Sequence, residues 1–385
     1  MTSQIQLNTI KLSILSLSRE KSWLFTNSIL QLLYHSIEEY KDEDEVNCNN
    51  QNNLDDSDND YDDEYSSSSI SSYESDENLR KSIDNTSKIK IEDKTENQDQ
   101  DDLFFHISYT PCEVTIICSK RLMSKLFSNP IQLCKELNFD DVELIEQDFL
   151  SLIVESDGSF DKSLRILELT KPLSENNISL FYLSSHFNDI VLFPIQFKNK
   201  VVKILHEKFE FETAFDFDDD DDISAHELNE LEIFEKLKKN YISPIINERV
   251  KLLLTGSRSN EVKNSILKIA KILSTTNLIP KYFTITRTSF TELSLILPKS
   301  TKKRAKLGFD AKYIIGSVQD TIIPITIDLH QLPIDTTGIV ASLANKLIKN
   351  GDNLIELNYF SMAKSGIIMV PIENLELVSS ILKNI

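Results

Sequence analysis

The stretch NNISLFYLSSHFNDIVLFP, residues 176–194, contains two short apolar segments on either side of a small polar turn. Apolar segments of this length around a short turn predict two antiparallel β-strands, that is, a β-hairpin. Pro194 has no amide hydrogen to give to a sheet and suits the first turn of a helix, so it marks the end of the second strand. The same pattern occurs three more times in the chain.

Segments with the same two apolar runs lie at residues 103–118, 282–298 and 355–371. Two of them end, like the first hairpin, in an apolar triplet and a proline. A predicted strand, a turn and an amphipathic helix precede the hairpin in three copies, and a short helix follows it in two. These helices are predicted over residues 161–173, 260–274 and 339–349 before the hairpin, and over 195–208 and 372–385 after it.

Each repeat is therefore predicted to contain a strand, a helix, two strands and a helix, in that order. A last strand is predicted at residues 209–213, at the end of the second repeat. This is the order of the ferredoxin-like βαββαβ module, so the expected fold class is α+β with four modules in tandem. Four copies in the same order favour a repeat over a generic α+β protein whose hairpins merely look alike. The modules are expected over residues 5–130, 140–213, 248–305 and 310–385.

Two acidic segments interrupt or separate these modules. Residues 41–101 are rich in Asp, Glu, Asn and Ser. They are too polar to offset their ordering entropy, so a disordered insert is expected in the first module. The serine-rich run 62–77 inside it is either a phosphorylation target or a solvated loop without a selected role. Residues 214–247 are expected to be an acidic linker, and the basic run KSTKKRAK, residues 299–306, is also expected to be a linker.

Composition excludes several classes of protein. The net charge of −20 over 385 residues argues against a nucleic-acid partner, which would require clustered Lys and Arg. No apolar run approaches the roughly 18 to 20 residues of a membrane span. The four cysteines form no CxxC pair and the N-terminus does not resemble a signal peptide, so a cytosolic or nuclear protein with reduced thiols is expected, and the cytoplasm is the predicted location.

The residues also argue against an enzyme. The seven glycines are too far apart to form GxGxxG or a phosphate-binding loop, and neither HExxH nor GxSxG occurs. We therefore expect no catalytic residues, no metal and no cofactor.

Small βαββαβ modules that pair edge to edge resemble ACT domains, which bind amino acids between neighbouring modules. The second and fourth units are similar to the CASTOR family of cytosolic arginine sensors. The stretches that carry this resemblance are SENNISLFYLSSHFNDIVLF (174–193), DGSF (157–160) and LPIDTTGIVASL (332–343), and residues 23–33 and 103–117 look like the family's first module. The resemblance implies an amino-acid site between the second and fourth modules and a partner of the GATOR type upstream of the TOR kinase.

A ligand site is predicted where Gly338 ends a loop and a helix begins. Free backbone amides at a helix start favour a ligand's carboxylate. In the CASTOR-like family, this loop and the first hairpin strand of the second module form two walls around arginine. The resemblance therefore assigns ligand contacts to Ser179, Leu180, Thr336, Thr337, Gly338 and Ile339.

The remaining wall departs from the family pattern. Where the family has Thr-Phe-Lys-Phe-Asp, this chain has MAKSG, whose ends, Met362 and Gly366, complete the predicted site. Gly366 stands in the place of the acid that would meet a cationic ligand, so arginine would lose a partner worth about 1.5–3 kcal/mol per charge-assisted bond. Asp335 either replaces that acid or is a solvated turn residue. The residues indicate an amino acid or similar small zwitterion, and arginine, though possible, is not favoured.

A partner site is predicted in the hairpin turn of the second module. By resemblance, His186, Phe187 and Asp189 would contact the GATOR-type partner; Asp189 matches the family and the other two differ. An exposed Phe187 would suit an interface, or its ring packs on its own hairpin.

The expected function is that of a non-enzymatic, amino-acid-binding regulatory protein of the CASTOR type, signalling to a nutrient-sensing partner of the TOR pathway. Two alternatives stay open. One is a ligand-independent scaffold with a decayed pocket, and the other is a regulatory subunit of a biosynthetic enzyme. The residues are also compatible with a homodimer.

Overall fold

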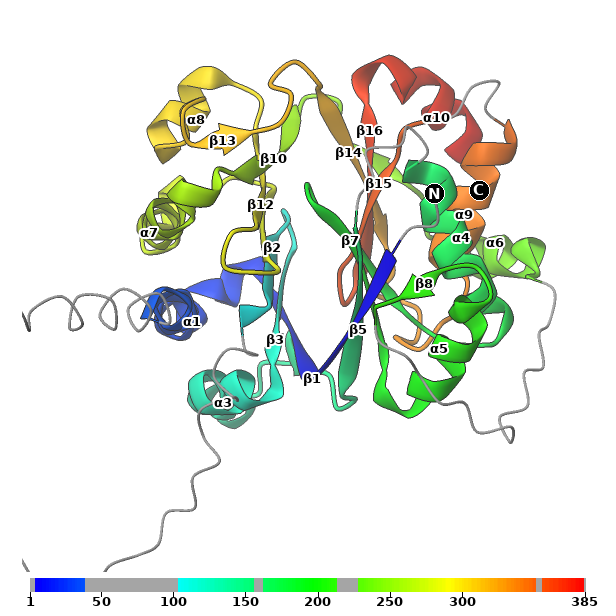
Figure 1. The fold of residues 1–385 in the computed structure, drawn as a ribbon, viewed down its shortest axis with the longest axis horizontal. Helices are drawn as coiled ribbons and strands as arrows, with labels where there is room; N and C mark the ends of the chain where they lie inside the picture. The colour runs from blue at the N-terminus through cyan, green and yellow to red at the C-terminus, as the bar shows by residue number, and fades with distance from the viewer. Residues whose placement is uncertain (1–3, 39–102, 156–161, 213–227, 351–354, 384–385) are drawn as a thin grey trace, which may run out of the picture. The chain divides into compact units, whose positions relative to one another are not determined.

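The computed structural model describes residues 4–38, 103–155, 162–212, 228–350 and 355–383 (Figure 1). The described residues on both sides of the predicted acidic insert belong to one compact unit. Three predicted features lie outside the described residues: the insert at 41–101, the DGSF turn at 157–160 and the first part of the linker, 214–227.

The order strand, helix, strand, strand, helix occurs four times along the described chain. The first repeat contains β1 (Gln4–Ser18), α1 (Thr26–Glu38), β2 (Phe105–Tyr109), β3 (Glu113–Ser119) and α3 (Lys120–Glu136). The second contains β5 (Phe149–Glu155), α4 (Lys162–Glu175), β6 (Phe181–Ser184), β7 (Asn188–Pro194) and α5 (Lys198–His206). The third contains β10 (Leu252–Ser257), α7 (Val262–Leu273), β11 (Phe283–Arg287), β12 (Leu293–Pro298) and α8 (Thr301–Leu307). The fourth contains β14 (Ile322–Asp328), α9 (Ile339–Asn350), β15 (Asn358–Ser361), β16 (Ser365–Pro371) and α10 (Leu375–Leu382).

The hairpin predicted at residues 176–194 is confirmed as β6 and β7, which pair antiparallel. The other three predicted hairpins are also antiparallel strand pairs. The strands β7, β12 and β16 all end at their prolines, which have no amide hydrogen to extend the ladder. A helical turn begins directly after Pro194 and Pro371.

The strands form a closed ring. Their order is β10-β12-β11-β2-β3-β1-β5-β7-β6-β15-β16-β14, and the pairing of Leu252 in β10 with Ile322 in β14 closes it. Equivalent strands of different repeats meet four times. The first strands pair as β1–β5 and β10–β14, and the strands that follow the first helix pair as β2–β11 and β6–β15. Strand β1 has 15 residues and takes part in both halves of the ring, pairing with β3 through residues 12–18 and with β5 mainly through residues 5–8.

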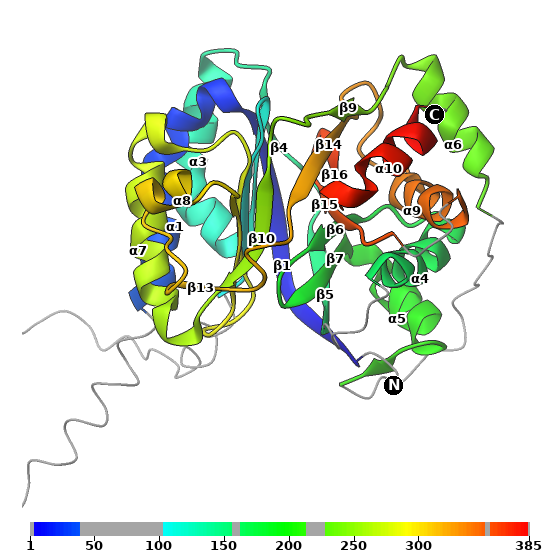
Figure 2. The ribbon, with the colours of Figure 1, turned by 90° about the horizontal axis from the view of Figure 1, so that it is seen from above.

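Helices cover the outside of the ring (Figures 1 and 2). Helices α1, α3, α7 and α8 lie on one side, and α4, α5, α9 and α10 lie on the other. Each side has its own apolar core, which includes Phe127 and Ile266 on the first side and Leu169 and Leu343 on the second. Alternate strand residues such as Leu192 form smaller clusters on the inner faces. No helix among the described residues is both long and apolar enough to cross a lipid bilayer.

Three segments differ from the predicted order. The strand predicted at 209–213 is β8 (Glu210–Phe211), and it pairs with β1 instead of with β5 of its own repeat. The described part of the predicted linker at 214–247 contains α6 (Glu230–Lys239) and β9 (Ile245–Ile246), which pairs with β14. Helix α6 is not a linker because it buries Ile233, Phe234 and Leu237 in the core that contains α9. Residues 299–306, also predicted as a linker, form most of α8.

A buried carboxylate joins β3 to the turn between β15 and β16. Oε1 of Glu113 accepts hydrogen bonds from the hydroxyls of Ser16 (3.1 Å) and Thr115 (3.0 Å). The Lys364 amide (3.0 Å) donates to the same oxygen, and the Ser365 hydroxyl (2.9 Å) donates to Oε2. Burial raises the pKa of Glu113, although these donors act in the opposite direction. This one side chain therefore connects segments that are about 250 residues apart in the sequence.

Substitution of Glu113 tests this connection. Leu at this position would leave four donors unpaired, at about 1–3 kcal/mol each, so Glu113→Leu should lower the free energy of unfolding by at least about 3 kcal/mol. Glu113→Gln keeps the shape and can keep the bonds, because the Ser365 hydroxyl can turn and accept. Urea unfolding of both variants measures the difference.

The pH dependence provides an independent check. When folding raises the pKa of a carboxyl group, the folded protein loses stability as the pH rises from the ordinary pKa of that group through the raised value. The wild type should therefore lose stability relative to Glu113→Gln over that range. Two results would contradict this account. One is a difference in the free energy of unfolding between wild type and Glu113→Gln that is the same at every pH. The other is a Glu113→Leu variant as stable as Glu113→Gln.

Candidate functional site

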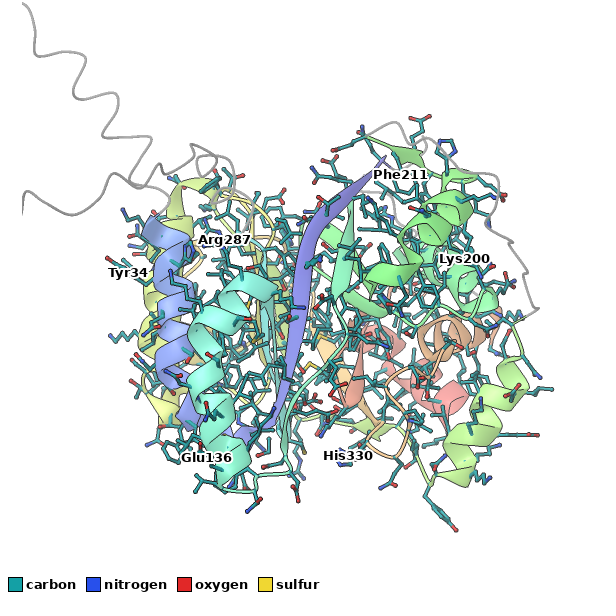
Figure 3. All side chains as sticks on the ribbon, turned by 90° about the horizontal axis from the view of Figure 1, so that it is seen from below. Tyr34, Glu136, Lys200, Phe211, Arg287 and His330 are labelled. Carbon is teal, nitrogen blue, oxygen red and sulfur yellow. The ribbon has the colours of Figure 1, made fainter. Side chains whose placement is uncertain are left out.

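The loop between β14 and α9 forms one wall of the candidate site (Figure 3, where His330 marks this loop). The Leu329 amide donates a hydrogen bond to the Lys364 carbonyl (2.9 Å), so the loop is attached to the turn between β15 and β16. Further along, the Thr336 amide donates to the Pro333 carbonyl (3.0 Å). These bonds hold the loop folded beside the start of α9.

The loop ends at Gly338, whose φ of +84° lies in the left-handed region that suits glycine. The Ser342 amide donates to the Gly338 carbonyl (2.8 Å), which is the first bond of α9. A Cβ at Gly338 would lie 3.1 Å from Leu228 Cδ1, so the space beside it is also limited. The first amides of α9 have no acceptor within the helix and are available to a ligand's carboxylate.

A cavity of about 60 Å³ lies between this loop, the beginning of β6 and the hairpin of β15 and β16. The lining contains hydroxyl groups and apolar side chains but, within the described ranges, no charged side chain. Its residues are Ser174, Leu180, Phe181, Leu329, Leu332, Pro333, Ile334, Thr336, Gly338, Ile339, Val340, Tyr359, Ser361, Met362, Ala363 and Ser365.

The floor of the cavity is the seam between β6 and β15. Only Leu183 and Phe360 are directly paired there. Two reciprocal bonds complete the seam, because the Tyr182 amide donates to Ser361 Oγ (2.9 Å) and the Tyr359 amide donates to Ser184 Oγ (3.0 Å). Serine side chains thus replace backbone carbonyls in holding the two strands together.

The phenol of Tyr359 explains why residue 366 is glycine. A Cβ at Gly366 would lie 3.1 Å from Tyr359 Cζ and closer still to the hydroxyl. The tyrosine therefore occupies the space that a side chain at position 366 would need. Burial raises the pKa of Tyr359, so the phenol stays protonated and can donate a hydrogen bond. The place expected for an acid is thus taken by a neutral hydroxyl group.

The structure brings together five of the eight residues predicted to bind the ligand. Leu180, Thr336, Gly338, Ile339 and Met362 line the cavity, whereas Ser179, Thr337 and Gly366 do not. Asp335 is exposed and does not line it either, in agreement with the interpretation as a solvated turn residue.

Sequence reasoning missed the tyrosine and the serines that line the cavity. Tyr359 and Ser361 lie in the predicted fourth hairpin, but nothing in the sequence indicates which strand β15 pairs with. Ser365 belongs to MAKSG, where the resemblance puts it in the place of an aromatic residue and gives it no ligand contact. Whether these residues bind a ligand stays a prediction.

The turn between β6 and β7 faces the third repeat. A Cβ at Gly256 in β10 would overlap the rings of His186 and Phe187, and one at Gly316 would overlap His186. The His186 amide also donates to Ser294 Oγ in β12 (3.0 Å). Phe187 is therefore half-buried against the chain's own β10 and packs edge-to-face on His186 of its own turn, so the first of the two alternatives, an exposed ring, is wrong.

Asp189 is buried beside the same turn. Its carboxylate lies 3.5 Å from Nη1 of Arg165 in α4, and both side chains are largely shielded from water. An internal ion pair of this kind is costly to break, because one charge would be left without its partner. The prediction that His186, Phe187 and Asp189 bind a partner stays a prediction, but most of their surface is already in contact with this chain.

The contact between Tyr359 and Gly366 can be tested by a double-mutant cycle. Gly366→Ala should destabilise the protein by about 1–3 kcal/mol, because its methyl group overlaps the phenol. Tyr359→Phe removes the overlapping oxygen, so the same Gly366→Ala change should cost less in that background. Thermal unfolding of the four proteins measures the coupling, and equal costs in both backgrounds would contradict the proposed overlap.

A second cycle tests how the β6–β7 turn docks. Gly256→Ala should be destabilising because its methyl group meets the rings of His186 and Phe187. Phe187→Ala should relieve part of that cost, with a coupling energy of about 0.5–3 kcal/mol in urea unfolding. If Gly256→Ala is harmless in the wild type, the turn does not pack on β10 in solution.

A family model described as ACT domain matches residues 144–207 and 317–384, which lie within the second and fourth predicted modules. A comparison with curated proteins gave no match. Among solved structures, aspartate kinase from Synechocystis matches with 9% identity and a TM-score of 0.33, over 99% of this chain and 56% of that one. This chain thus spans little more than half of that protein's length, and the TM-score is too low to support a common fold. The chain thus contains two regions, residues 144–207 and 317–384, that are similar to ACT domains.

Proposed function

We propose that this protein is a non-enzymatic regulatory protein that binds a free amino acid in the cavity beside α9. One observation carries the proposal: the start of α9 and the hydroxyl-bearing residues Tyr359, Ser361 and Ser365 converge on one cavity. All of them belong to the region 317–384 that matches the ACT domain. Amides at a helix start favour a carboxylate, and hydroxyl oxygens accept hydrogen bonds from an ammonium group.

The size and polarity of the cavity favour a small ligand. A space of about 60 Å³ holds on the order of four to six water-sized groups. Glycine, alanine or serine is of that size, whereas arginine is not. A cationic side chain would also need a carboxylate, and none lines the cavity in the described part of the chain. The ligand proposed is therefore a small amino acid with an uncharged side chain.

We extend the ACT assignment to all four repeats. Two features support this: the element order is the same in each repeat, and the equivalent strands of two repeats meet in both β2–β11 and β6–β15. The unmatched first and third repeats would then form one pair of modules, and the matched second and fourth repeats would form the other.

The finer proposal is a cytosolic protein of the CASTOR type that signals to a partner of the GATOR type in the TOR pathway. It is supported by the sequence resemblance at residues 174–193 and 332–343. The hydrogen bonds from the MAKSG turn to Glu113 supply a physical route for such signalling. A ligand that contacts Ser365 would act on a hydroxyl already bonded to the first repeat, and could change how the two halves pack.

Calorimetry with a panel of amino acids tests the proposed function. The wild type should bind glycine, alanine or serine and give no binding heat with arginine. Ala363→Leu should abolish the binding by filling the cavity. Ala305→Leu adds the same atoms on exposed α8, outside the cavity, and should leave binding unchanged. A panel without binding heat for any amino acid would refute the proposal.

A ligand-independent scaffold is the second candidate, and one observation favours it. The Tyr359 phenol already fills part of the space between the repeats, so the cavity could be the remnant of a larger site. Pull-down from cells expressing the wild type or Ala363→Leu separates the two functions. If the protein is a sensor, the partners recovered with the wild type should change when the ligand is added, whereas those recovered with Ala363→Leu should stay the same. A scaffold should recover the same partners in every case.

A further inference from the structure

A second cavity, of about 590 Å³, lies on the third repeat, away from the amino-acid cavity. Its lining brings together basic residues from three separate segments of the chain. They are Arg249 and Lys251 before β10, Lys281 before β11, and Lys299, Lys303 and Lys306 around α8. The sequence by itself indicated only the last of these segments as basic. We call this cavity the basic groove.

The basic groove has no compensating acid. No carboxylate lines it among the described residues, although the chain as a whole carries a net charge of −20. Of these six basic side chains, only that of Lys299 has hydrogen-bond partners in the described ranges. Its ammonium group donates to the neutral carbonyls of Val318 and Gln319 (2.7 Å to the latter). Like charges held close together repel one another, so a bound anion would stabilise this arrangement.

The floor of the basic groove is apolar. Leu278, Ile279, Pro280 and Leu307 line it together with Tyr282. The Tyr282 hydroxyl is already engaged, because it accepts from Asn247 Nδ2 (2.8 Å) and lies 2.9 Å from Thr326 Oγ1. The Tyr282 side chain is itself only 2% exposed, so the apolar surface open to a ligand comes mainly from the half-buried Leu278, Ile279 and Pro280. A cavity of 300–1,000 Å³ with an apolar surface and a few convergent charges is typical of small-molecule sites.

The walls of the basic groove are preformed. The guanidinium of Arg19 donates to the carbonyls of Ile279 (3.1 Å), Pro280 (2.9 Å) and Lys281 (3.0 Å), which fixes the loop before β11. The Lys299 amide donates to the Lys251 carbonyl (2.9 Å), which joins the other two segments. A ligand would therefore find the backbone of the site already ordered, and little binding energy would be lost in arranging it.

We infer that the basic groove binds a small molecule with several phosphate groups attached to an apolar or planar part, such as a nucleoside triphosphate. Phosphate oxygens accept charge-assisted hydrogen bonds from Lys and Arg, and several phosphates match several cations. The apolar part would lie against Leu278, Ile279 and Pro280 on the floor. This site is independent of the amino-acid cavity, because the two share no lining residue.

Calorimetry on the full chain, with ATP, inorganic triphosphate and adenosine as separate probes, tests the inference. ATP should bind most tightly, triphosphate more weakly and adenosine least, because only ATP uses both the cations and the floor. The affinity for ATP should fall as salt is raised. No binding of ATP or triphosphate at low salt would overturn the inference.

Substitution of the lysines that line the basic groove tests whether ATP binds there. Lys281→Gln, Lys303→Gln and Lys306→Gln together should weaken ATP binding about a thousandfold, from about tenfold for each of the three lost cations. Lys125→Gln, Lys263→Gln and Lys271→Gln make the same charge change at exposed positions outside the groove and should have little effect. Equal weakening by both triple variants would overturn the inference.

Lysine acylation, measured by mass spectrometry, tests the location of the ATP site in the wild-type protein without any substitution. ATP should protect Lys281, Lys303 and Lys306 and leave Lys263 and Lys271 reactive. Protection by a polyglutamate peptide but by none of the phosphate compounds would overturn the inference in favour of an acidic polypeptide.

Discussion

The whole assembly depends on the requirement that every strand edge finds a partner for its backbone. Strand β1 meets much of this requirement, because it pairs with β3 through one end and with β5 through the other. The two halves of the ring are therefore joined by continuous backbone pairing. At the β6–β15 seam only one direct pair forms, and Ser184 and Ser361 supply the missing acceptors. A closed ring leaves few edges open to other chains.

The candidate site is a product of that seam. Because β6 and β15 meet at their equivalent positions, the start of α9 lies beside the first residues of β6 and a cavity remains between them. The Tyr359 phenol sets the size and the charge of this cavity, since it takes the space of a side chain at position 366. Neutral hydroxyl groups line the place where a carboxylate was expected. Buried charge would be costly there without a partner, so the polarity of the cavity agrees with a ligand that has no extra charge.

The two halves of the ring differ in what they offer to other molecules. The half with the second and fourth repeats contains the small neutral cavity, and the third repeat contains the basic groove. Glu113 connects the halves by accepting bonds from the turn that borders the small cavity. Its burial inside the ring is tolerated because every donor around it is used, and this makes the turn a rigid link between the repeats.

The sequence by itself determined the local elements, because apolar periodicity and proline placement act over a few residues. It predicted the four hairpins, five of the helices beside them and five of the residues that line the cavity, but not α3, α6 or α8. Only the tertiary structure decided which strands became neighbours, since edge pairing depends on contacts between distant segments. For that reason β9 fills a place beside β14, Tyr359 faces Gly366, and Arg249, Lys281 and Lys303 converge on one groove. Charge and side-chain type are visible in a sequence, but their convergence is a property of the folded chain.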